Sequence, residues 1–196
     1  MQLSVVIQAG GESRRMGRDK ALAPFLGEPL IQRVCERMAG LGDELIVTSN
    51  HPQELAFLNL PCFPDLVTDR GALGGLYTAL VQARYPLVAV LACDLPFANP
   101  ALIRFAWERT GAVDVVIPDS GSGLEPLHAV YRRETCLPAI REALDTGKWR
   151  VDAWFAKVQV RILERPEYAH LDPAKWTFIN VNTPEELASA EALARA

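Results

Sequence analysis

Three short runs of apolar residues divide the first half of the chain, and each run stops at glycine or at a polar residue. They cover 3–8 (LSVVIQ), 44–50 (ELIVTSN) and 86–94 (PLVAVLACD), the last of which ends in Asp94. Continuous apolar runs rich in β-branched residues are typical of strands that are buried on both faces. The pattern therefore predicts a mostly parallel sheet covered by helices.

Between these runs, apolar residues recur at helical spacing. The first such segment covers 30–41 and follows Pro29, because proline is favoured at the start of a helix. Asn99 and Pro100 form a cap before a helix to about Arg109, and Thr183 opens a capping box. Further helices are predicted at 52–58, 72–84, 134–145 and from 184 onward, and further strands at 60–65, 112–118, 126–132, 157–163 and 177–182.

The alternation of strands and helices predicts an α/β fold of three layers, with the whole chain, 1–196, as a single domain. The alternation is less regular near 126–132 and 157–163. The later strands therefore leave room for an antiparallel member of the sheet.

Composition and charge narrow the classes of partner. The apolar fraction of 49% is sufficient for a sizeable core, and the chain carries 24 acidic against 20 basic residues, a net charge of −4. An acidic balance disfavours nonspecific binding of nucleic acid, which depends on neutralising phosphates. No uncharged apolar run reaches the roughly 18 residues of a membrane span. We expect a cytoplasmic protein that binds neither nucleic acid nor a membrane.

The first strand is followed by two adjacent glycines, Gly10 and Gly11, and then by a concentration of positive charge. The basic residues are Arg14, Arg15, Arg18 and Lys20. Glycines let the backbone approach a flat ring or a phosphate closely, and Arg15 and Lys20 can neutralise phosphate oxygens. Arg14 and Arg18 fit a solvated loop equally well. The segment predicts a site for an anion, which we interpret as a nucleoside triphosphate.

Ligands of open parallel sheets bind beyond the carboxyl ends of the strands. Three strand ends carry informative residues there: Gln8, Thr48 and Asp94. A carboxylate at the end of a buried strand is a structural turn residue or a metal ligand, and Mg²⁺ typically takes one or two carboxylates together with phosphates and water. Opposite a phosphate loop, we interpret Asp94 as a magnesium ligand.

Asp69 precedes a helix that starts at glycines, in TDRGALGGL. Its carboxylate is either an ordinary loop residue or an acceptor for the two adjacent donors on the Watson–Crick edge of guanine. The second interpretation would make Asp69 the residue that selects the base.

Several of these segments together resemble one known family. AGGESRRMGRDKAL, LGEPLI, DRGALGGL, ACDLPF, EPLHAVYRR and INVNTPEEL are similar to segments of the molybdenum cofactor guanylyltransferases, also called molybdopterin-guanine dinucleotide synthases of the MobA type. The resemblance extends over residues 5 to 187. It implies a Rossmann-like nucleotidyltransferase fold and a Mg²⁺-dependent transfer of GMP from GTP to the terminal phosphate of molybdopterin or of its molybdenum-loaded form.

The resemblance also implies roles for individual residues. Gln8, Ala9 and Gly10, with Asp69, would hold the guanine nucleotide, Lys20 its phosphates, and Asp94 both Mg²⁺ and nucleotide. Asn180 and Asn182 would lie on the pterin side, and Arg15 and Arg150 are candidates for the phosphate of the acceptor. Contact with other proteins that handle the molybdenum cofactor would be transient.

Two residues depart from the family pattern. Gln8 stands where leucine or isoleucine is usual, and Thr48 stands where many relatives have asparagine, so a nucleotide contact from either side chain is an open expectation. Alternative functions are a related cytidylyltransferase, a guanylyltransferase with another phosphorylated acceptor, and a nucleotide-binding regulator without turnover. The mechanism that we expect is direct in-line transfer, because a phosphate monoester is already a charged nucleophile at neutral pH.

Overall fold

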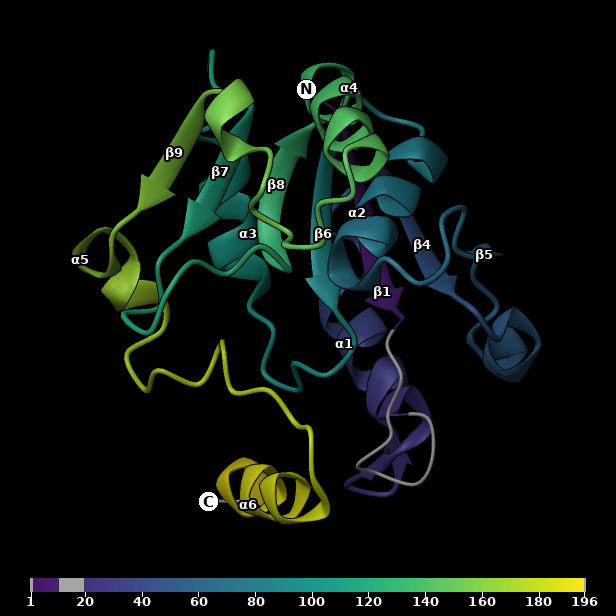
Figure 1. The fold of residues 1–196 in the computed structure, drawn as a ribbon. Coiled ribbons are helices and arrows are strands. Elements are labelled where there is room, and N and C mark those ends of the chain that lie inside the picture. Colours follow the sequence, from purple (N-terminus) through teal and green to yellow (C-terminus); the bar gives the residue numbers. More distant parts are fainter. Residues whose placement is uncertain (1, 11–19, 196) are drawn as a thin grey trace.

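A computed structural model describes residues 2–10 and 20–195. Its centre is a seven-stranded sheet (Figure 1). The strands are β1 (Leu3–Ala9), β4 (Glu44–Ser49), β5 (Cys62–Phe63), β6 (Leu87–Ala92), β7 (Val115–Pro118), β8 (His128–Arg132) and β9 (Val160–Leu163).

The strands lie in the order β5-β4-β1-β6-β8-β7-β9. β1 pairs in parallel with β4 on one side and with β6 on the other, and β7 pairs in parallel with β9. β8 runs antiparallel to both of its neighbours. The mostly parallel sheet is confirmed, and the antiparallel strand is 128–132, in the part of the chain where the alternation loses its regularity.

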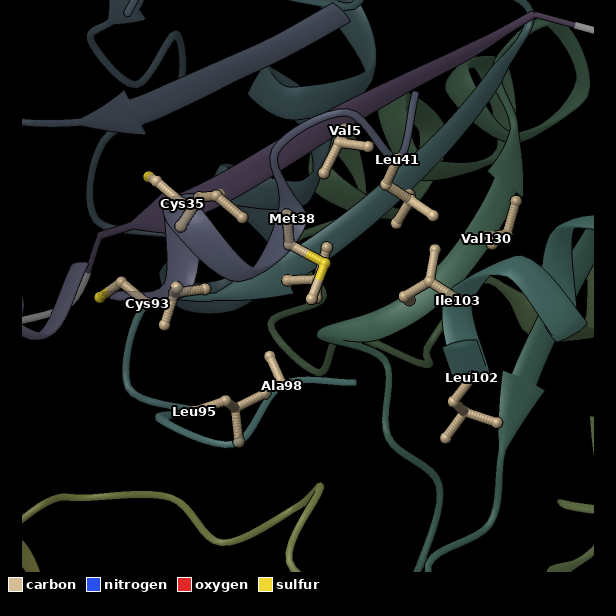
Figure 2. Close-up of a cluster of buried hydrophobic side chains, with 14 of the residues drawn as sticks. Val5, Cys35, Met38, Leu41, Cys93, Leu95, Ala98, Leu102, Ile103 and Val130 are labelled. Carbon is tan, nitrogen blue, oxygen red and sulfur yellow. The ribbon is translucent and has the colours of Figure 1, made fainter. Parts of the chain in front are cut away.

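Helices cover both faces of this sheet and complete the α/β/α layers. α1 (Leu30–Met38) and α3 (Pro100–Trp107) pack on one face, and α2 (Gly71–Gln82) and α4 (Arg133–Asp145) on the other. Figure 2 shows Met38 of α1 and Ile103 of α3 within the first of these two cores. The three-layer α/β fold is therefore as the alternating pattern predicted.

The helix boundaries have local causes. The buried residues of α1 repeat at helical spacing, and Pro29 stands at its N-cap. The side chain of Asn99 accepts hydrogen bonds from the backbone N–H groups of Ala101 and Leu102, which caps α3 as predicted. No helix in the described part of the chain combines the length and the apolar character that a membrane span requires.

Shorter elements and a C-terminal helix complete the described part of the chain. They are η1 (Lys20–Leu22), β2 (Pro24–Phe25), β3 (Glu28–Pro29), η2 (Pro52–Leu58), η3 (Phe155–Lys157), α5 (Arg165–Tyr168), η4 (Ala169–Leu171) and α6 (Pro184–Arg195). β2 and β3 form a short antiparallel hairpin. Glu186 and Thr183 exchange the two hydrogen bonds of a capping box at the start of α6.

The strand predicted at 177–182 is wrong, because this segment is an irregular connection. The backbone N–H of Val181 donates to the carbonyl of Asp94 at 3.0 Å, and that of Ile179 closes a turn onto Trp176 at 2.9 Å. Phe178 packs against the core that contains α1 and α3, whereas Ile179 and Val181 belong to a separate cluster that includes Ala190 of α6. The apolar spacing thus reflects contacts with two cores and not the two faces of one strand.

Candidate active site

Three residues predicted for the site meet at one point. The Nζ atom of Lys20 lies 3.5 Å from Oδ2 of Asp94, and it also donates a hydrogen bond to Oδ1 of Asn182. The side chains of Lys20 and Asp94 are 24% and 19% exposed, so both are accessible from one side. A cation, a carboxylate and an amide thus share one partly buried position.

The sheet itself places Asp94 there. β6 ends at Ala92, and the N–H of Cys93 donates to the carbonyl of Gln8 at 3.1 Å, which keeps the ends of β1 and β6 in register. Asp94 follows immediately, close to where β1 leads into Gly10. The ends of the strands predicted at 3–8 and 86–94 therefore lie side by side in the fold, as expected.

Asp94 lies in an environment that opposes its negative charge. Burial raises the pKa of its carboxyl above the usual value, while the Coulombic attraction of Lys20 and the hydrogen bond from it act in the opposite direction. A carboxylate held against desolvation by one cation is suited to bind a further positive charge.

Gln8 faces away from this position and into the layer between the sheet and α2. Its side chain is 4% exposed, and a Cβ atom placed on Gly75 of α2 would lie 2.1 Å from Gln8 Nε2. Thr48 is the partner of Gln8 across β1 and β4, and it is fully buried. Gln8 Oε1 and Thr48 Oγ1 have no hydrogen-bond partner within the described residues.

A second carboxylate, which the sequence pattern did not single out, lies beside Gly10. Asp65 follows β5, and its Oδ2 atom is 3.2 Å from the position that a Cβ atom on Gly10 would take. Burial raises the pKa of the Asp65 carboxyl, and a hydrogen bond with the Asn50 side chain partly opposes the shift. Asp65 Oδ1 is buried and has no partner in the part of the chain that is described. A carboxylate directly after a strand was the signal that could have found it.

Asp69 has a different setting. It is exposed, it adopts a left-handed backbone conformation with φ 57°, and it lies two residues before α2 begins. Its neighbour Arg70 places its guanidinium carbon 4.7 Å from the ring centre of Trp149, an exposed residue in the turn after α4. The structure thus brings Asp65, rather than Asp69, against Gly10.

Arg150 lies away from Lys20 on the face that carries α2 and α4. It is exposed and pairs with Asp152 at 2.8 Å. It borders a cavity of about 400 Å³ whose other lining residues are Leu124, Pro126, Val151, Asp152 and Phe155. Two of its lining residues, Leu124 and Pro126, shortly precede β8, whose first residue His128 pairs with Leu91 of β6.

Two of the remaining predicted residues lie in the described part of the chain. Asn180 is exposed and lies two positions before Asn182, and Ala9 ends β1. Gly11, Arg14, Arg15 and Arg18 lie outside the described residues.

Solved structures with the same arrangement support the assignment of the fold. A structure described as molybdopterin-guanine dinucleotide biosynthesis protein A from Archaeoglobus fulgidus superposes with a TM-score of 0.85, covers 98% of each chain and is 23% identical. A nucleotidyl transferase from Methanothermobacter gives a TM-score of 0.75 over 100% of this chain and 99% of its own, at 17% identity. At these identities the similarity establishes the fold.

The sequence comparisons establish the class and the family. The MobA-like NTP transferase domain matches residues 5–161. The protein is thus an enzyme of the nucleotidyltransferase class.

The molybdenum cofactor guanylyltransferase of Desulfosudis oleivorans is 35% identical over 97% of this chain and 95% of its own. A protein named probable molybdenum cofactor guanylyltransferase from Pelotomaculum thermopropionicum is 36% identical over 99% and 94%. The chain belongs to the molybdenum cofactor guanylyltransferases of the MobA-like NTP transferase family.

Proposed function

We propose that the protein transfers GMP from GTP to the terminal phosphate of molybdopterin, or of molybdenum-loaded molybdopterin, in a reaction that requires Mg²⁺. The products are molybdopterin guanine dinucleotide and pyrophosphate. The observation that carries the proposal is the meeting of Lys20, Asp94 and Asn182 at the carboxyl ends of the central strands, in a chain whose relatives carry the name of this activity.

The nucleotide would lie over the end of β1. The exposed Gly10 has no side chain to exclude a ring or a phosphate, and Lys20 supplies a cation for the phosphate oxygens. Two carboxylates are candidates to accept the guanine donors: Asp69, from the sequence, and Asp65, because it lies against Gly10. Gly11 and Thr48 stay predicted nucleotide contacts, and Arg15 a predicted phosphate contact.

The residues present fit a magnesium ion of the kind that a nucleotide brings with it. Among the described residues no group of three or more His, Cys, Asp or Glu side chains forms a metal site. Asp94 alone suits Mg²⁺ in such a site, because the ion takes one or two carboxylates and fills its other positions with phosphates and water. When bound, Mg²⁺ would supply positive charge to the phosphoryl oxygens and to the departing pyrophosphate.

The acceptor would approach from the side of Asn182. Asn182 contacts Lys20, and Asn180 is exposed nearby in the same segment. The cavity beside Arg150 offers space for a ring system and a guanidinium for a phosphate. Asn180 and Asn182 would therefore hold the acceptor with its terminal phosphate toward Asp94, and Arg150 stays a predicted contact of the acceptor.

The chemistry needs few catalytic groups. A terminal phosphate oxygen of the acceptor attacks the α-phosphorus of GTP, a new P–O bond forms, and the bond from that phosphorus to the bridging oxygen of the β-phosphate breaks. Pyrophosphate departs with that oxygen and its electron pair. The second pKa of a phosphate monoester is about 6, so the nucleophile needs no strong base at neutral pH. Lys20 reduces the repulsion between the two anions and holds the reacting atoms in line.

The proposal is tested by mixing the protein with Mg²⁺, molybdopterin and GTP, CTP or ATP, and by measuring the release of pyrophosphate and the dinucleotide formed. We expect release with GTP and molybdopterin together and not with either alone. Release with CTP instead of GTP would assign a cytidylyltransferase. Tight binding of GTP without release, with either acceptor form, would assign a regulator.

A further inference from the structure

A third hydrophobic core lies outside the two that flank the sheet and beside the proposed site, because its member Val181 precedes Asn182 and donates from its N–H to the carbonyl of Asp94. We call it the hub. Its ring contacts are close: Phe25 and Phe97 meet edge to face at 6.1 Å, and Phe97 lies 5.3 Å from the ring of Trp176. Its buried members are Phe25, Leu30, Phe97, Val181 and Ala190.

The hub joins the three segments that carry the site residues. Each segment contributes a buried hub residue only a few positions away from its functional side chain. These pairs are Lys20 with Phe25, Asp94 with Phe97, and Asn182 with Val181. Because the three segments are distant in sequence, their mutual arrangement depends on contacts in the hub together with the direct bonds from Lys20 to Asp94 and Asn182.

Arg33, which lies on α1, links two of these segments. Its guanidinium carbon lies 4.8 Å from the ring centre of Phe25 and 6.0 Å from that of Phe97. Its Nε atom also donates to the carbonyl of Pro96 at 2.9 Å, two residues after Asp94. One side chain therefore contacts the hairpin that follows Lys20 and the loop that carries Asp94.

Arg33 stands on a helix that is anchored in the core. The helix that carries it, α1, packs the fully buried Val34 and Met38 into the core beside the sheet. Figure 2 shows Met38 in this core. A guanidinium that stacks on aromatic rings and donates a hydrogen bond at the same time has a fixed geometry that an ammonium group cannot reproduce. Arg33 can therefore fix the hairpin that contains Phe25 and the loop that contains Pro96 relative to the core.

We propose that Arg33 is a positioning residue for the transfer reaction, which sets the separation of Lys20 and Asp94 through Phe25 and Pro96. The inference rests on the proposed roles of Lys20 and Asp94. A displacement of about 1 Å between reacting groups can cost about 100-fold in rate. Loss of Arg33 should therefore affect turnover and the use of Mg²⁺ more than the stability of the fold.

The same helix provides a matched control. Arg37 lies one turn further along α1 and donates from Nε to the carbonyl of Ala98 at 2.7 Å. It thus makes the same kind of hydrogen bond to the same loop, but the described residues show no aromatic ring under it. A purely structural role for these arginines predicts similar effects from both substitutions.

The experiment compares Arg33→Ala, Arg33→Lys and Arg37→Ala with the parent enzyme. The measured quantities are kcat, KM for GTP, the Mg²⁺ concentration for half-maximal rate, the melting temperature, and calorimetric binding of GTP with and without Mg²⁺. We expect Arg33→Ala to lower kcat by about tenfold or more and to raise the Mg²⁺ requirement, with a smaller change in KM. The kcat of Arg33→Lys should lie between those of the parent and Arg33→Ala. Arg37→Ala should keep the parent's kcat, although its melting temperature should be similar to that of Arg33→Ala.

Equal effects of Arg33→Ala and Arg37→Ala on kcat and on the Mg²⁺ requirement would overturn the inference, as would an Arg33→Lys variant identical to the parent. If the parent enzyme releases no pyrophosphate, the proposed function fails first. Calorimetry then still tests Arg33, because its loss should reduce the gain in GTP affinity that Mg²⁺ provides, whichever acceptor the enzyme uses. An unchanged gain in Arg33→Ala would contradict the inference independently of turnover.

Discussion

Lys20 and Asp94 lie 74 positions apart in the chain, and their charged groups are 3.5 Å apart in the fold. The parallel register of β1 and β6 places Asp94 beside the end of β1, and η1, which begins at Lys20, brings the ammonium group to it. Lys20 is therefore placed to neutralise Asp94 before substrates arrive and phosphate oxygens afterwards. A cation shared in this way lets one small site hold several negative charges.

Replacing Lys20 with alanine should weaken the binding of GTP and slow the transfer. A charge-assisted hydrogen bond contributes roughly 1.5–3 kcal/mol, which corresponds to an increase of about tenfold or more in the dissociation constant. Calorimetric titration with GTP and Mg²⁺ measures this change, and Lys20→Arg is the control that keeps the charge. GTP affinity unaltered by the alanine substitution would contradict the role of Lys20.

Asp65 and Asp69 are the two candidates for the carboxylate that recognises guanine, and substitutions at each position distinguish them. Asp65 lies against Gly10, whereas Asp69 is exposed two residues before α2. We expect Asp65→Asn to reduce the preference for GTP over ATP and CTP, because an amide adds a donor opposite the guanine donors. Asp69→Ala should have the smaller effect.

The measurement for this pair is kcat/KM with each of the three nucleotides. A full preference for GTP in Asp65→Asn, together with a lost preference in Asp69→Ala, would assign guanine reading to Asp69. A preference retained by both variants would exclude both carboxylates from base selection.

Gly75 and Gln8 form a matched pair between α2 and β1. A methyl group on Gly75 would lie 2.1 Å from Nε2 and 2.5 Å from Cδ of the buried Gln8 side chain. Gly75→Ala should therefore destabilise the fold by about 1–3 kcal/mol through overpacking, although alanine is the better helix former. The measurement is chemical denaturation.

The double variant Gln8→Ala/Gly75→Ala isolates this contact. Removing the amide makes room for the methyl group, so the double variant should be more stable than the sum of the single effects predicts. Strict additivity of the two substitutions would show that the two side chains do not compete for the same space.

His128 predicts a pH dependence of stability. It is fully buried in β8, its Nε2 accepts from Asn99 N–H at 3.1 Å, and burial lowers its pKa from 6.5 to about 4. The folded state therefore binds this proton less readily than the unfolded state. The contribution of His128 is complete above pH 6.5 and is lost as the pH falls to about 4, by an amount on the order of 3 kcal/mol.

The test is the free energy of unfolding between pH 7 and about pH 4.5 for the parent and for His128→Gln, which keeps an acceptor without titrating. The parent should lose more stability over this range than the variant. Parallel curves for the two proteins would assign the acid sensitivity to other groups.

The sequence predicted those features that depend on local pattern or on a general rule of sheets. The run 86–94 identifies β6 and places Asp94 at its end, and parallel strand ends converge, so the position of Asp94 beside the end of β1 was predictable. Asp65 was missed because the predicted strand 60–65 included it, whereas β5 ends at Phe63, and only the fold brings its carboxylate against Gly10. The segment 177–182 was misassigned because its apolar residues contact two different cores.

The spacing of apolar and polar residues along the chain could not predict long-range contacts. Nothing in the spacing of Arg33 distinguishes it from Arg37 on the same helix. Only the fold brings Phe25 and Pro96 to Arg33. The side chain of Gln8 likewise could have faced the nucleotide or the helix layer, and the register of β1 determines that it faces Gly75.

The most direct test of the account is the rate of pyrophosphate release by Asp94→Asn, with GTP, Mg²⁺ and molybdopterin. The substitution preserves shape and removes the charge that would hold the metal, so we expect near-complete loss of turnover in a protein with an unchanged circular dichroism spectrum. Turnover close to that of the parent enzyme would contradict it, because the site would then work without the carboxylate at the end of β6.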